Sequence, residues 1–407
     1  IYHYDAAHHR LILLREGRFD EYVDRALGGR CRTADAFAVL FISVYFWKNF
    51  FKYYLFSYRL QGLDTGVLLG QLREAAARFG FTPHVFGQFL DRALNHLLGL
   101  AEEVESVYAV VPLAAGRCRS VLVWRTEESC TAQQLIRELP SLTLPHYIRS
   151  RNISPYPLLL RMHQASLQGE TAAFQADRGE ERDQERGERD EPEPFPVIPL
   201  PSVPETEMDL ADLTRKRYSP ETDFVFRSIS LADLSSLLRS ASAPAGFCDL
   251  DAGSDLVRFC RGQLICATFS GVEGLESGAY RYDAQTHSLK LLRSGDHREW
   301  LQYGMLMPNV NMMQVPTCFH IAGDRGHCLD IWGARGYRLQ QMEAGMCTQR
   351  LLLAAAAHGW GGRPLLSFDA EAMDDLYRLP RRGQTALIQV PAGPYRFRAR
   401  WANRMHG

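Results

Sequence analysis

The sequence lacks the cysteine spacing of a zinc site or a disulfide framework. Its nine cysteines are scattered, none belongs to a Cys-x-x-Cys pair, and their number is odd. Structural zinc sites use closely spaced cysteine or histidine pairs, and small disulfide-rich domains use an even number of cysteines. We therefore expect reduced thiols and a cytoplasmic location.

No apolar run is long enough to cross a membrane as a helix. The most apolar stretch, residues 36–47, reads AFAVLFISVYFW and is followed at once by Lys48. A membrane-spanning helix needs about 20 apolar residues. The aromatic and β-branched residues of this stretch predict a buried strand instead. No signal-peptide pattern is present, and because the first residue is Ile1, we expect part of the natural N-terminus to lie outside this sequence.

Neither sign of charge dominates. The formal net charge is -1, so no overall field favours binding to nucleic acid or to an anionic membrane. The charge is instead concentrated in residues 179–196, GEERDQERGERDEPEPFP, which contain almost no apolar residues. Such a mixed-charge, proline-rich run predicts a solvated linker. With 46% hydrophobic residues in 407, the rest of the chain is long enough for two or three globular domains.

An internal repeat decides the organisation of the chain. Residues 1–17 read IYHYDAAHHRLILLREG and residues 279–295 read AYRYDAQTHSLKLLRSG. At an offset of 278 (279 − 1), the second stretch repeats the residues Tyr2, Tyr4, Asp5, His9, Leu11, Leu13, Leu14, Arg15 and Gly17. So dense a match over a short window predicts that the same structural unit occurs twice.

The repeat continues through a helix and a closing strand. Tyr58-Arg59-Leu60-Gln61 recurs as Tyr337-Arg338-Leu339-Gln340, and each copy goes on in an Ala/Leu-rich helical pattern. Each ends in an apolar strand, YAVVPLAAG (108–116) or ALIQVPAG (386–393). The predicted first copy (residues 1–120) matches only the second half of the unit. A connector (121–205) with a short amphipathic helix at 158–168 precedes the complete second copy (206–407), in which Ser230 is expected to cap a helix over 231–240.

The second copy resembles the nitroreductase superfamily in its SagB-type branch. The resemblance is carried by RKRYSPETDF (215–224), GVEGLESGAYRYDAQTHSLKLLRSGD (271–296), GYRLQQMEAGMCTQRLLLAAAAHGWGG (336–362) and ALIQVPAG (386–393). These segments follow the order of the family. The resemblance implies an α+β, nitroreductase-like fold that binds FMN, present here as a tandem pseudo-dimer with a degenerate first copy.

In the first copy, FFKYYLFSYRLQGLDTG (50–66) resembles a feature of the SagB-type (McbC-like) azoline dehydrogenases. These enzymes carry a Lys-Tyr pair a few residues before the Tyr-Arg that opens a helix, and here the pair falls on Lys52-Tyr53. The fused, partly truncated tandem is most similar to the dehydrogenases of thiopeptide and related thiazole pathways. The absence of the first half of copy one has two open explanations, loss during evolution or a boundary of the sequence at hand.

The resemblance implies a set of FMN contacts in the second copy, together with a basic pair after the closing strand. Guanidinium groups match phosphate oxygens in geometry and charge. Glycines permit close backbone approach to a cofactor. The alternative is that the arginines are solvated surface residues and that Gly359 ends a helix. The residues concerned are Arg215, Arg217, Ser219, Gly359, Gly361, Gly362, Arg396 and Arg398.

Lys52 and Tyr53 are the predicted catalytic residues. Conversion of an azoline to an azole removes a hydride and a proton from neighbouring ring carbons, and FMN accepts only the hydride. A lysine whose ammonium pKa is lowered by burial or by a nearby cation can accept the proton. The alternative is that Lys52 is a surface lysine on an aromatic helix and Tyr53 belongs to the core.

Comparison of the copies favours the catalytic interpretation. Lys52-Tyr53 aligns with Ile331-Trp332 at an offset of 279 (331 − 52), so the second copy lacks the pair. The first copy in turn lacks its own phosphate site. In the family, flavin lies in a dimer interface and contacts both protomers. We therefore expect an internal pseudo-dimer with one flavin site, and further pairing of the chain as a homodimer stays open.

The sequence thus predicts an oxygen-dependent FMN dehydrogenase acting on a thiazoline- or oxazoline-containing precursor peptide, with cyclodehydratases as partner proteins. Two alternatives stay open, an NAD(P)H-dependent nitroreductase and a flavin-free scaffold that presents a peptide. His320 and His327 are too far apart in sequence for a common metal site, so no metal is expected. Gly323–Gly326 lacks the Gly-Lys-Ser/Thr of a phosphate loop.

Overall fold

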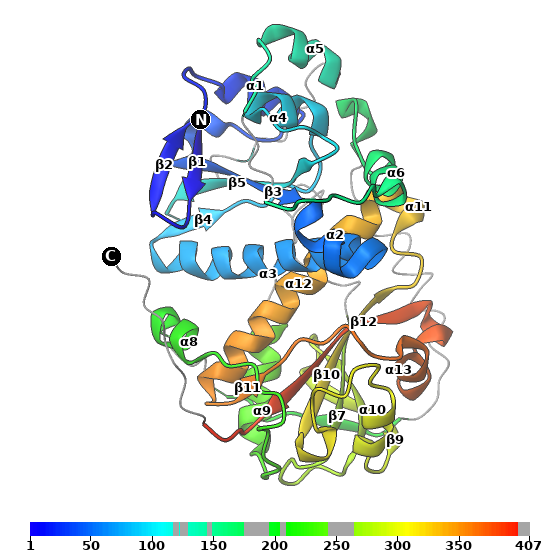
Figure 1. Cartoon of the computed structure of the whole chain (residues 1–407). Helices are drawn as coiled ribbons and strands as arrows, with labels where there is room; N and C mark the ends of the chain where they lie inside the picture. The colour runs from blue at the N-terminus through cyan, green and yellow to red at the C-terminus, as the bar shows by residue number, and fades with distance from the viewer. Residues whose placement is uncertain are drawn as a thin grey trace. The chain divides into compact units, whose positions relative to one another are not determined.

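The computed structural model describes residues 1–116, 122, 129–144, 149–174, 195–203, 209–242 and 264–397 (Figure 1). The chain forms two structural units. Unit 1 comprises residues 1–187, 244–262 and 326–346, and unit 2 comprises residues 188–243, 263–325 and 347–407. Helix α12 (Ala334–Ala357) therefore contributes residues 334–346 to unit 1 and residues 347–357 to unit 2.

Unit 2 is built on a seven-stranded antiparallel sheet with the order β11-β12-β10-β7-β8-β9-β6. Its central strands β10 and β12 are almost wholly buried, and their buried polar residues His320 and Gln389 are hydrogen-bonded to each other. The strands are β6 (Val197–Pro199), β7 (Leu264–Phe269), β8 (Gly278–Asp283), β9 (Ser288–Ser294), β10 (Thr317–Asp324), β11 (Gly361–Gly362) and β12 (Gln384–Gly393).

Short helices complete unit 2: α8 (Leu210–Lys216), α9 (Leu231–Ala241), α10 (Arg298–Tyr303) and α13 (Ala370–Leu376). Leu301 of α10 and Met373 of α13 share one hydrophobic core with Cys266 and Cys318 of the sheet. The side chain of Ser230 accepts a hydrogen bond from the backbone of Asp233, so it caps α9 as the sequence predicts.

Unit 1 contains a three-stranded antiparallel sheet, with the order β3-β5-β4, and a separate hairpin of β1 and β2. The strands are β1 (Tyr2–Asp5), β2 (Arg10–Leu13), β3 (Ala38–Tyr45), β4 (Phe81–Pro83) and β5 (Glu105–Ala115). The helices are α1 (Asp20–Ala26), α2 (Trp47–Tyr53), α3 (Ser57–Arg78), α4 (Asp91–Leu98), α5 (Ala132–Glu138), α6 (Pro157–Ala165), α11 (Leu329–Trp332) and the first half of α12.

Strand β5 lies between two hydrophobic cores of unit 1. Val107 and Val110 pack with α1, α4 and α5 in one core. Tyr108 and Val111 pack in the other core with residues of α2, α3, α6 and α12. The predicted strand in residues 36–47 is β3, and the predicted helix in 158–168 is α6.

The strand registers confirm the repeat. In unit 1, Ala38 of β3 pairs with Leu113 of β5, and in unit 2 Thr317 pairs with Ala392, at an offset of 279 (317 − 38) for both partners. Each pair of strands carries an irregularity at the matching step, after Ile42 in β3 and after Ile321 in β10. A bulge at the same place in two copies is an inherited feature of the backbone.

A buried side chain holds the same turn in both copies. The amide oxygen of Asn95 accepts a hydrogen bond of 3.0 Å from the backbone of Val107. Its counterpart Asp374 accepts one of 2.7 Å from the backbone of Ala386. Each polar group links the helix before the closing strand to that strand, so the copies share their internal framework as well as their strand order.

The first copy has no counterpart of β7 among the described residues. In unit 2, β7 pairs with both β10 and β8 and thereby joins the hairpin β8–β9 to the rest of the sheet. The matching strands of the first copy, β3 and β1, belong to two separate sheets. Without this central strand among the described residues, the strands that form one sheet in the second copy form two sheets in the first.

Helices α3 and α12 cross at two equivalent glycines in unit 1 (Figure 1). A Cβ atom at Gly66 would lie 1.8 Å from the carbonyl oxygen of Met342, and one at Gly345 would lie 2.2 Å from that of Leu63. These contacts exchange under the repeat offset, so the crossing is close to two-fold symmetric. Only glycine allows the two backbones to approach so closely.

Several expectations concern residues outside this description. The predicted linker at 179–196 lies outside the described residues except for its last two positions, and so do Arg398 and three of the cysteines. The six cysteines within the described part of the chain are free thiols. Across the described ranges, no helix is long and apolar enough to cross a membrane.

Candidate functional site

A cavity of about 350 Å³ in unit 2 gathers three consecutive cationic residues. They come from the last turn of α8 and the residue after it. The opposite wall comes from the end of α12 and from the chain that follows β12. The lining residues are Arg215, Lys216, Arg217, Tyr218, Ala356, Gly359, Trp360, Tyr395 and Phe397. The cavity combines positive charge with aromatic walls, which suits an anionic group attached to a larger organic ligand.

Local interactions place these residues. The carboxylate of Asp209 accepts a hydrogen bond from the backbone of Ala211 and so caps α8, which ends at Lys216. Arg217 donates to the hydroxyl of Ser219 at 3.3 Å. The aromatic wall is fixed because Tyr218 donates a hydrogen bond to Asp223 and its ring lies 4.6 Å from that of Tyr395.

The structure brings several of the predicted phosphate contacts together. Arg215, Arg217 and Gly359 line the cavity, and Ser219 is hydrogen-bonded to one of them. Arg396 directly follows the cavity residue Tyr395, and its backbone donates to the carbonyl of Asp223 at 2.8 Å, while its side chain is exposed. Arg398 lies outside the described residues.

The predicted glycines have structural roles in addition to any contact with a ligand. Gly359 follows the end of α12 with φ +70°, the left-handed conformation typical of a helix C-terminus. At Gly361 a Cβ atom would lie 2.3 Å from the ring of Pro220, and at Gly362 it would lie 2.7 Å from Leu352. A side chain at Gly361 would therefore meet the rigid ring of Pro220, whereas at Gly362 the end of the Leu352 side chain would have to shift.

Lys52 and Tyr53 stand at the C-terminal end of α2 in unit 1. Both side chains are exposed, and the ammonium nitrogen of Lys52 lies 4.9 Å from the centre of the Tyr53 ring. This distance is typical of a cation–π contact, so the two side chains are mutually ordered. The apolar side chains that follow them are exposed too, which gives an exposed aromatic group consisting of Phe51, Tyr53, Tyr54, Leu55 and Phe56.

The residue after the pair has a strained backbone. Tyr54 adopts φ 49° and ψ -134°, a conformation that is rare for any residue with a side chain. Its counterpart in the second copy is Gly333, with φ 55° and ψ -153°. The backbone turn is thus the same in both copies, but only the first copy makes it with a non-glycine residue. Strain of this kind costs about 1–3 kcal/mol and is concentrated at functional sites.

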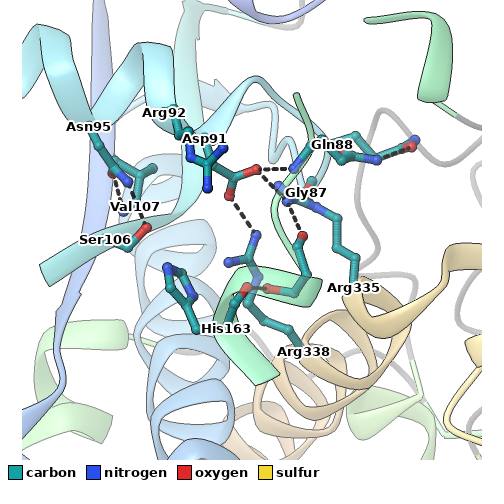
Figure 2. Close-up of polar contacts among 12 residues, drawn as sticks. Gly87, Gln88, Asp91, Arg92, Asn95, Ser106, Val107, His163, Arg335 and Arg338 are labelled. Carbon is teal, nitrogen blue, oxygen red and sulfur yellow. Dashed lines mark hydrogen bonds and ion pairs between the residues drawn. The ribbon is translucent and has the colours of Figure 1, made fainter. Parts of the chain in front are cut away.

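A buried ion-pair cluster occupies the start of α12 (Figure 2). The carboxylate of Asp91, wholly buried at the start of α4, accepts from Arg335 at 2.7 Å and from Arg338 at 3.1 Å. Burial by itself would raise the pKa of Asp91, but the two guanidinium groups outweigh it, so the pKa lies below its usual value. Arg338 is the arginine of the repeated Tyr-Arg motif, and it also stacks on Tyr108 at 4.6 Å.

His163 of α6 lies beside this cluster with both ring nitrogens buried and unpartnered among the described residues (Figure 2). Its ring is stacked against Tyr108 at 6.3 Å between ring centres. Burial, followed by the positive charge of Arg338, lowers the pKa of His163 to about 3. The imidazole is therefore neutral at physiological pH.

The two histidines considered as metal ligands have other partners. His320 is buried, donates to the amide oxygen of Gln389 at 2.9 Å and accepts from the hydroxyl of Tyr377 at 2.9 Å. Burial lowers its pKa to about 4. His327 is hydrogen-bonded to Gln340 at 2.7 Å. Within the described ranges no group of three or more acidic, histidine or cysteine side chains is placed to hold a metal ion.

Sequence reasoning missed the aromatic wall of the cavity and the strain at Tyr54. The wall residues Tyr218, Trp360 and Tyr395 each neighbour a predicted contact, so their proximity in sequence was the available signal. For Tyr54, the signal was its alignment with Gly333 at the repeat offset. The Asp91 cluster had no local signal, because its partners lie 244 and 247 residues away.

Comparison with known proteins shows which proteins the chain resembles. Residues 215–393 match the model of the nitroreductase family. No curated protein matches the chain. Among solved structures, a putative nitroreductase from Anabaena variabilis is similar over 97% of this chain and 77% of that chain, with a TM-score of 0.75 and 22% identity.

Other solved structures match about half of the chain. A putative nitroreductase from Ralstonia eutropha covers 50% of this chain and 90% of its own, with a TM-score of 0.39 and 21% identity. The E. coli microcin synthetase McbBCD complex with truncated pro-MccB17 bound covers 55% of this chain and 85% of its own, with a TM-score of 0.36 and 17% identity.

The family match includes the cavity residues 215–218, 356, 359 and 360, and the similarity of fold extends over nearly the whole chain. Members of the nitroreductase family are flavin-dependent oxidoreductases. Residues 215–393 are therefore similar to the nitroreductase family, and the overall fold of the chain is nitroreductase-like α+β with a repeated unit.

Proposed function

We propose that this chain is an FMN-dependent dehydrogenase that oxidises thiazoline or oxazoline rings of a ribosomally made peptide to thiazoles or oxazoles. The observation that carries the proposal is the position of Lys52 and Tyr53. They stand exposed at the end of α2, in contact with each other, directly before a strained residue. The matching positions of the second copy are Ile331 and Trp332, followed by an unstrained glycine.

The cavity of unit 2 fits the phosphate of FMN. Arg215, Lys216 and Arg217 offer cationic donors, of which Lys216 is also paired with Asp212 at 2.6 Å. Arg217 would bind together with Ser219, which it already contacts. The carboxylate of Asp223 accepts hydrogen bonds from the cavity residue Tyr218 and from the backbone of Glu221. These hydrogen bonds partly offset the repulsion between this carboxylate and a bound phosphate.

FMN, when bound, supplies a two-electron acceptor that takes a hydride from a ring carbon. The second hydrogen leaves the neighbouring carbon as a proton, and Lys52 is the residue proposed to accept it. Its side-chain nitrogen lies 4.9 Å from the centre of the Tyr53 ring, so Tyr53 is proposed to position the lysine. With oxygen as the final acceptor, one azoline and one O₂ give one azole and one H₂O₂, so atoms and electrons balance.

Two further features support a peptide substrate and a pseudo-dimer. The exposed aromatic group around Tyr53 offers apolar surface of the kind that planar heterocycles and side chains of a peptide bind. The near two-fold crossing at Gly66 and Gly345 matches the arrangement expected if the copies pair as protomers of one dimer. We propose one flavin per chain, with its phosphate held by the second copy and the proton acceptor supplied by the first. Partner cyclodehydratases would provide the azolines.

The substitution Lys52→Met tests the proposal. It removes the proton acceptor but keeps a side chain of similar length, so azole formation should fall by about 10²–10⁴-fold while bound flavin stays constant. Lys48→Met is the matched control, because Lys48 is exposed on the same helix one turn earlier. The measurements are mass loss of the peptide per ring and the visible flavin spectrum.

Other outcomes identify the competing functions. If NADH bleaches the bound flavin and Lys52→Met reduces a small acceptor as fast as the unmodified chain, the protein is a flavin reductase. If the purified protein is colourless and binds no added FMN, the chain is a flavin-free peptide-binding scaffold. Equal azole formation by Lys52→Met and Lys48→Met removes Lys52 from the mechanism.

A further inference from the structure

The hairpins β1–β2 and β8–β9 are built alike. Tyr4 and His9 are hydrogen-bonded at 3.0 Å, and their counterparts Tyr282 and His287 at 2.8 Å. Both histidines turn the chain with positive φ, 49° and 47°. The local sequence therefore specifies the same hairpin in both copies, with tyrosines and leucines at equivalent positions of one face.

The apolar faces of the two hairpins differ in burial. In the second copy Tyr280, Tyr282 and Leu289 are 0%, 6% and 1% exposed. Their counterparts Tyr2, Tyr4 and Leu11 are 61%, 54% and 65% exposed. The register places Tyr2, Tyr4, Leu11 and Leu13 on one face, which is named here the open hairpin face. The charged residues Asp5 and Arg10 lie on the other face.

The second copy shows what covers such a face. Phe269 of β7 packs against Tyr280 with ring centres 5.4 Å apart. The hydroxyl of Ser235 in α9 lies 2.7 Å from Nε2 of His287. The same helix, which carries buried leucines at 234, 237 and 238, therefore reaches the turn of the hairpin. In the part of the first copy that the structure describes, nothing equivalent to Ser235 reaches Nε2 of His9.

The strand that would adjoin this face is missing as well. In the second copy β7 pairs with β10 from Thr317 to Ala322 and with β8 from Gly278 to Arg281. The matching edges of the first copy, on β3 and β1, have no such strand among the described residues. Strand β3 is accordingly only half-buried, whereas its counterpart β10 is buried. Open strand edges beside an apolar face form a template for an added strand.

We propose that the open hairpin face is the docking site of a helix–strand segment from outside the 407 residues, of the same chemistry as α9 and β7. The helix would present leucines at positions 1, 4 and 5 of one face and a hydroxyl to Nε2 of His9. The strand would be apolar, about six residues long as β7 is, and would pair with β1 and β3. This proposal is independent of the proposed function.

A graft tests this docking site. Residues 209–278 are duplicated directly before Ile1, so that Gly278 precedes Ile1 as it precedes Ala279 in the chain itself. Amide hydrogen exchange in β1 and β3 should slow at least about tenfold, because exchange of paired, covered strands requires their opening. The control graft carries Leu237→Asp and Leu238→Asp in the duplicated segment and should leave exchange unchanged.

A point substitution tests the same docking site by a second measurement, the thermal stability of the chain. Leu11→Ser should lower Tm by about 5 °C in the grafted chain, where Leu11 is buried, and by less than about 1 °C in the ungrafted chain. Equal exchange in the two grafts, or equal effects of Leu11→Ser in both backgrounds, would overturn the proposal. So would light scattering that shows an ungrafted dimer converted to monomer by Leu11→Ser, because a second copy would then cover the face.

Discussion

The two copies of the repeat keep one framework but differ in what surrounds it. The bulge after Ile42 recurs after Ile321, and the role of Asn95 recurs in Asp374. The hairpin of the first copy, in contrast, has no covering helix and strand among the described residues. Strand register and the polar link between the last helix and the closing strand are therefore the features that the copies share, because an unpaired buried group is costly wherever it occurs.

The difference is equally clear in the buried polar groups of each copy. The first copy holds Asp91 between two arginines, at a position where the second copy has Ala370. The first copy also packs against His163, which has no partner for either ring nitrogen among the described residues, whereas His320 of the second copy has a partner for each. These buried polar groups of the first copy are thus charged or unpartnered, whereas the buried histidine of the second copy is neutral and hydrogen-bonded at both nitrogens.

The largest expected effect comes from Asp91→Asn. This change leaves two buried guanidinium groups without their counter-charge, so we expect a loss of about 3–5 kcal/mol in the free energy of unfolding. Urea denaturation followed by circular dichroism measures it. The same substitution at Asp35, which pairs with Arg32 in an exposed ion pair, is the matched control and should cost less than about 1 kcal/mol.

A result of similar size for both substitutions would contradict the interpretation of the cluster. It would mean that water or structural relaxation neutralises Arg335 and Arg338 when the carboxylate is lost. A chain of two structural units can unfold in two separate transitions. The free energies of the two variants should therefore be compared for the same transition, identified in the control variant.

The next largest effect is the pH dependence of the free energy of unfolding that the buried histidines His163 and His320 cause. Their pKa values are lowered to about 3 in His163 and about 4 in His320, from 6.5 in the unfolded chain. Between these pH values the histidines are protonated in the unfolded state but not in the folded state. The free energy of unfolding therefore has its full value above pH 6.5 and falls as the pH decreases. At pH 5 the loss is about 2 kcal/mol for each histidine.

Substitution of each histidine by phenylalanine separates them. His163→Phe removes an unpartnered imidazole and should make the chain about 2 kcal/mol more stable than the unmodified chain at pH 5, with little change at pH 7.5. His320→Phe should be less stable already at pH 7.5, because Tyr377 and Gln389 lose a buried partner. Thermal unfolding at the two pH values measures both. Equal stability of the two variants at pH 7.5 would show that the partners of His320 do not matter.

Much of the framework was predictable from the sequence. The repeat offsets of 278 and 279 align the strands, the central bulge and the hairpin turn, because hydrogen-bonding registers tolerate no slip when one face is buried. Local patterns were sufficient for β3 within residues 36–47, for α6 and for the cap at Ser230. These features depend on periodicity and on short-range hydrogen bonds.

The sequence did not predict the interactions that depend on tertiary packing. Asp91 meets its arginines across more than 240 residues of chain, and no local pattern marks a buried ion pair. The cavity was predicted by its arginines, which the family resemblance identified, but not by its aromatic wall. Gly361 and Gly362 were interpreted as positions of close approach to the flavin or of a tight turn, and their packing against Pro220 and Leu352 was not predicted. The role of Lys52 and Tyr53 stays a prediction.

The smallest expected effect tests the link between strain and function at Tyr54. Tyr54→Gly should raise the free energy of unfolding by about 1 kcal/mol, because relief of the backbone strain exceeds the added entropy of glycine in the unfolded chain. Tyr54→Ala keeps the strain and removes only the exposed ring, so it should bring no gain. If the strain holds Lys52 and Tyr53 in place, Tyr54→Gly should also slow azole formation more than Tyr54→Ala does. A slower Tyr54→Ala would instead assign the effect to the lost ring, and equal stability of the two variants would show that the backbone of Tyr54 stores no strain.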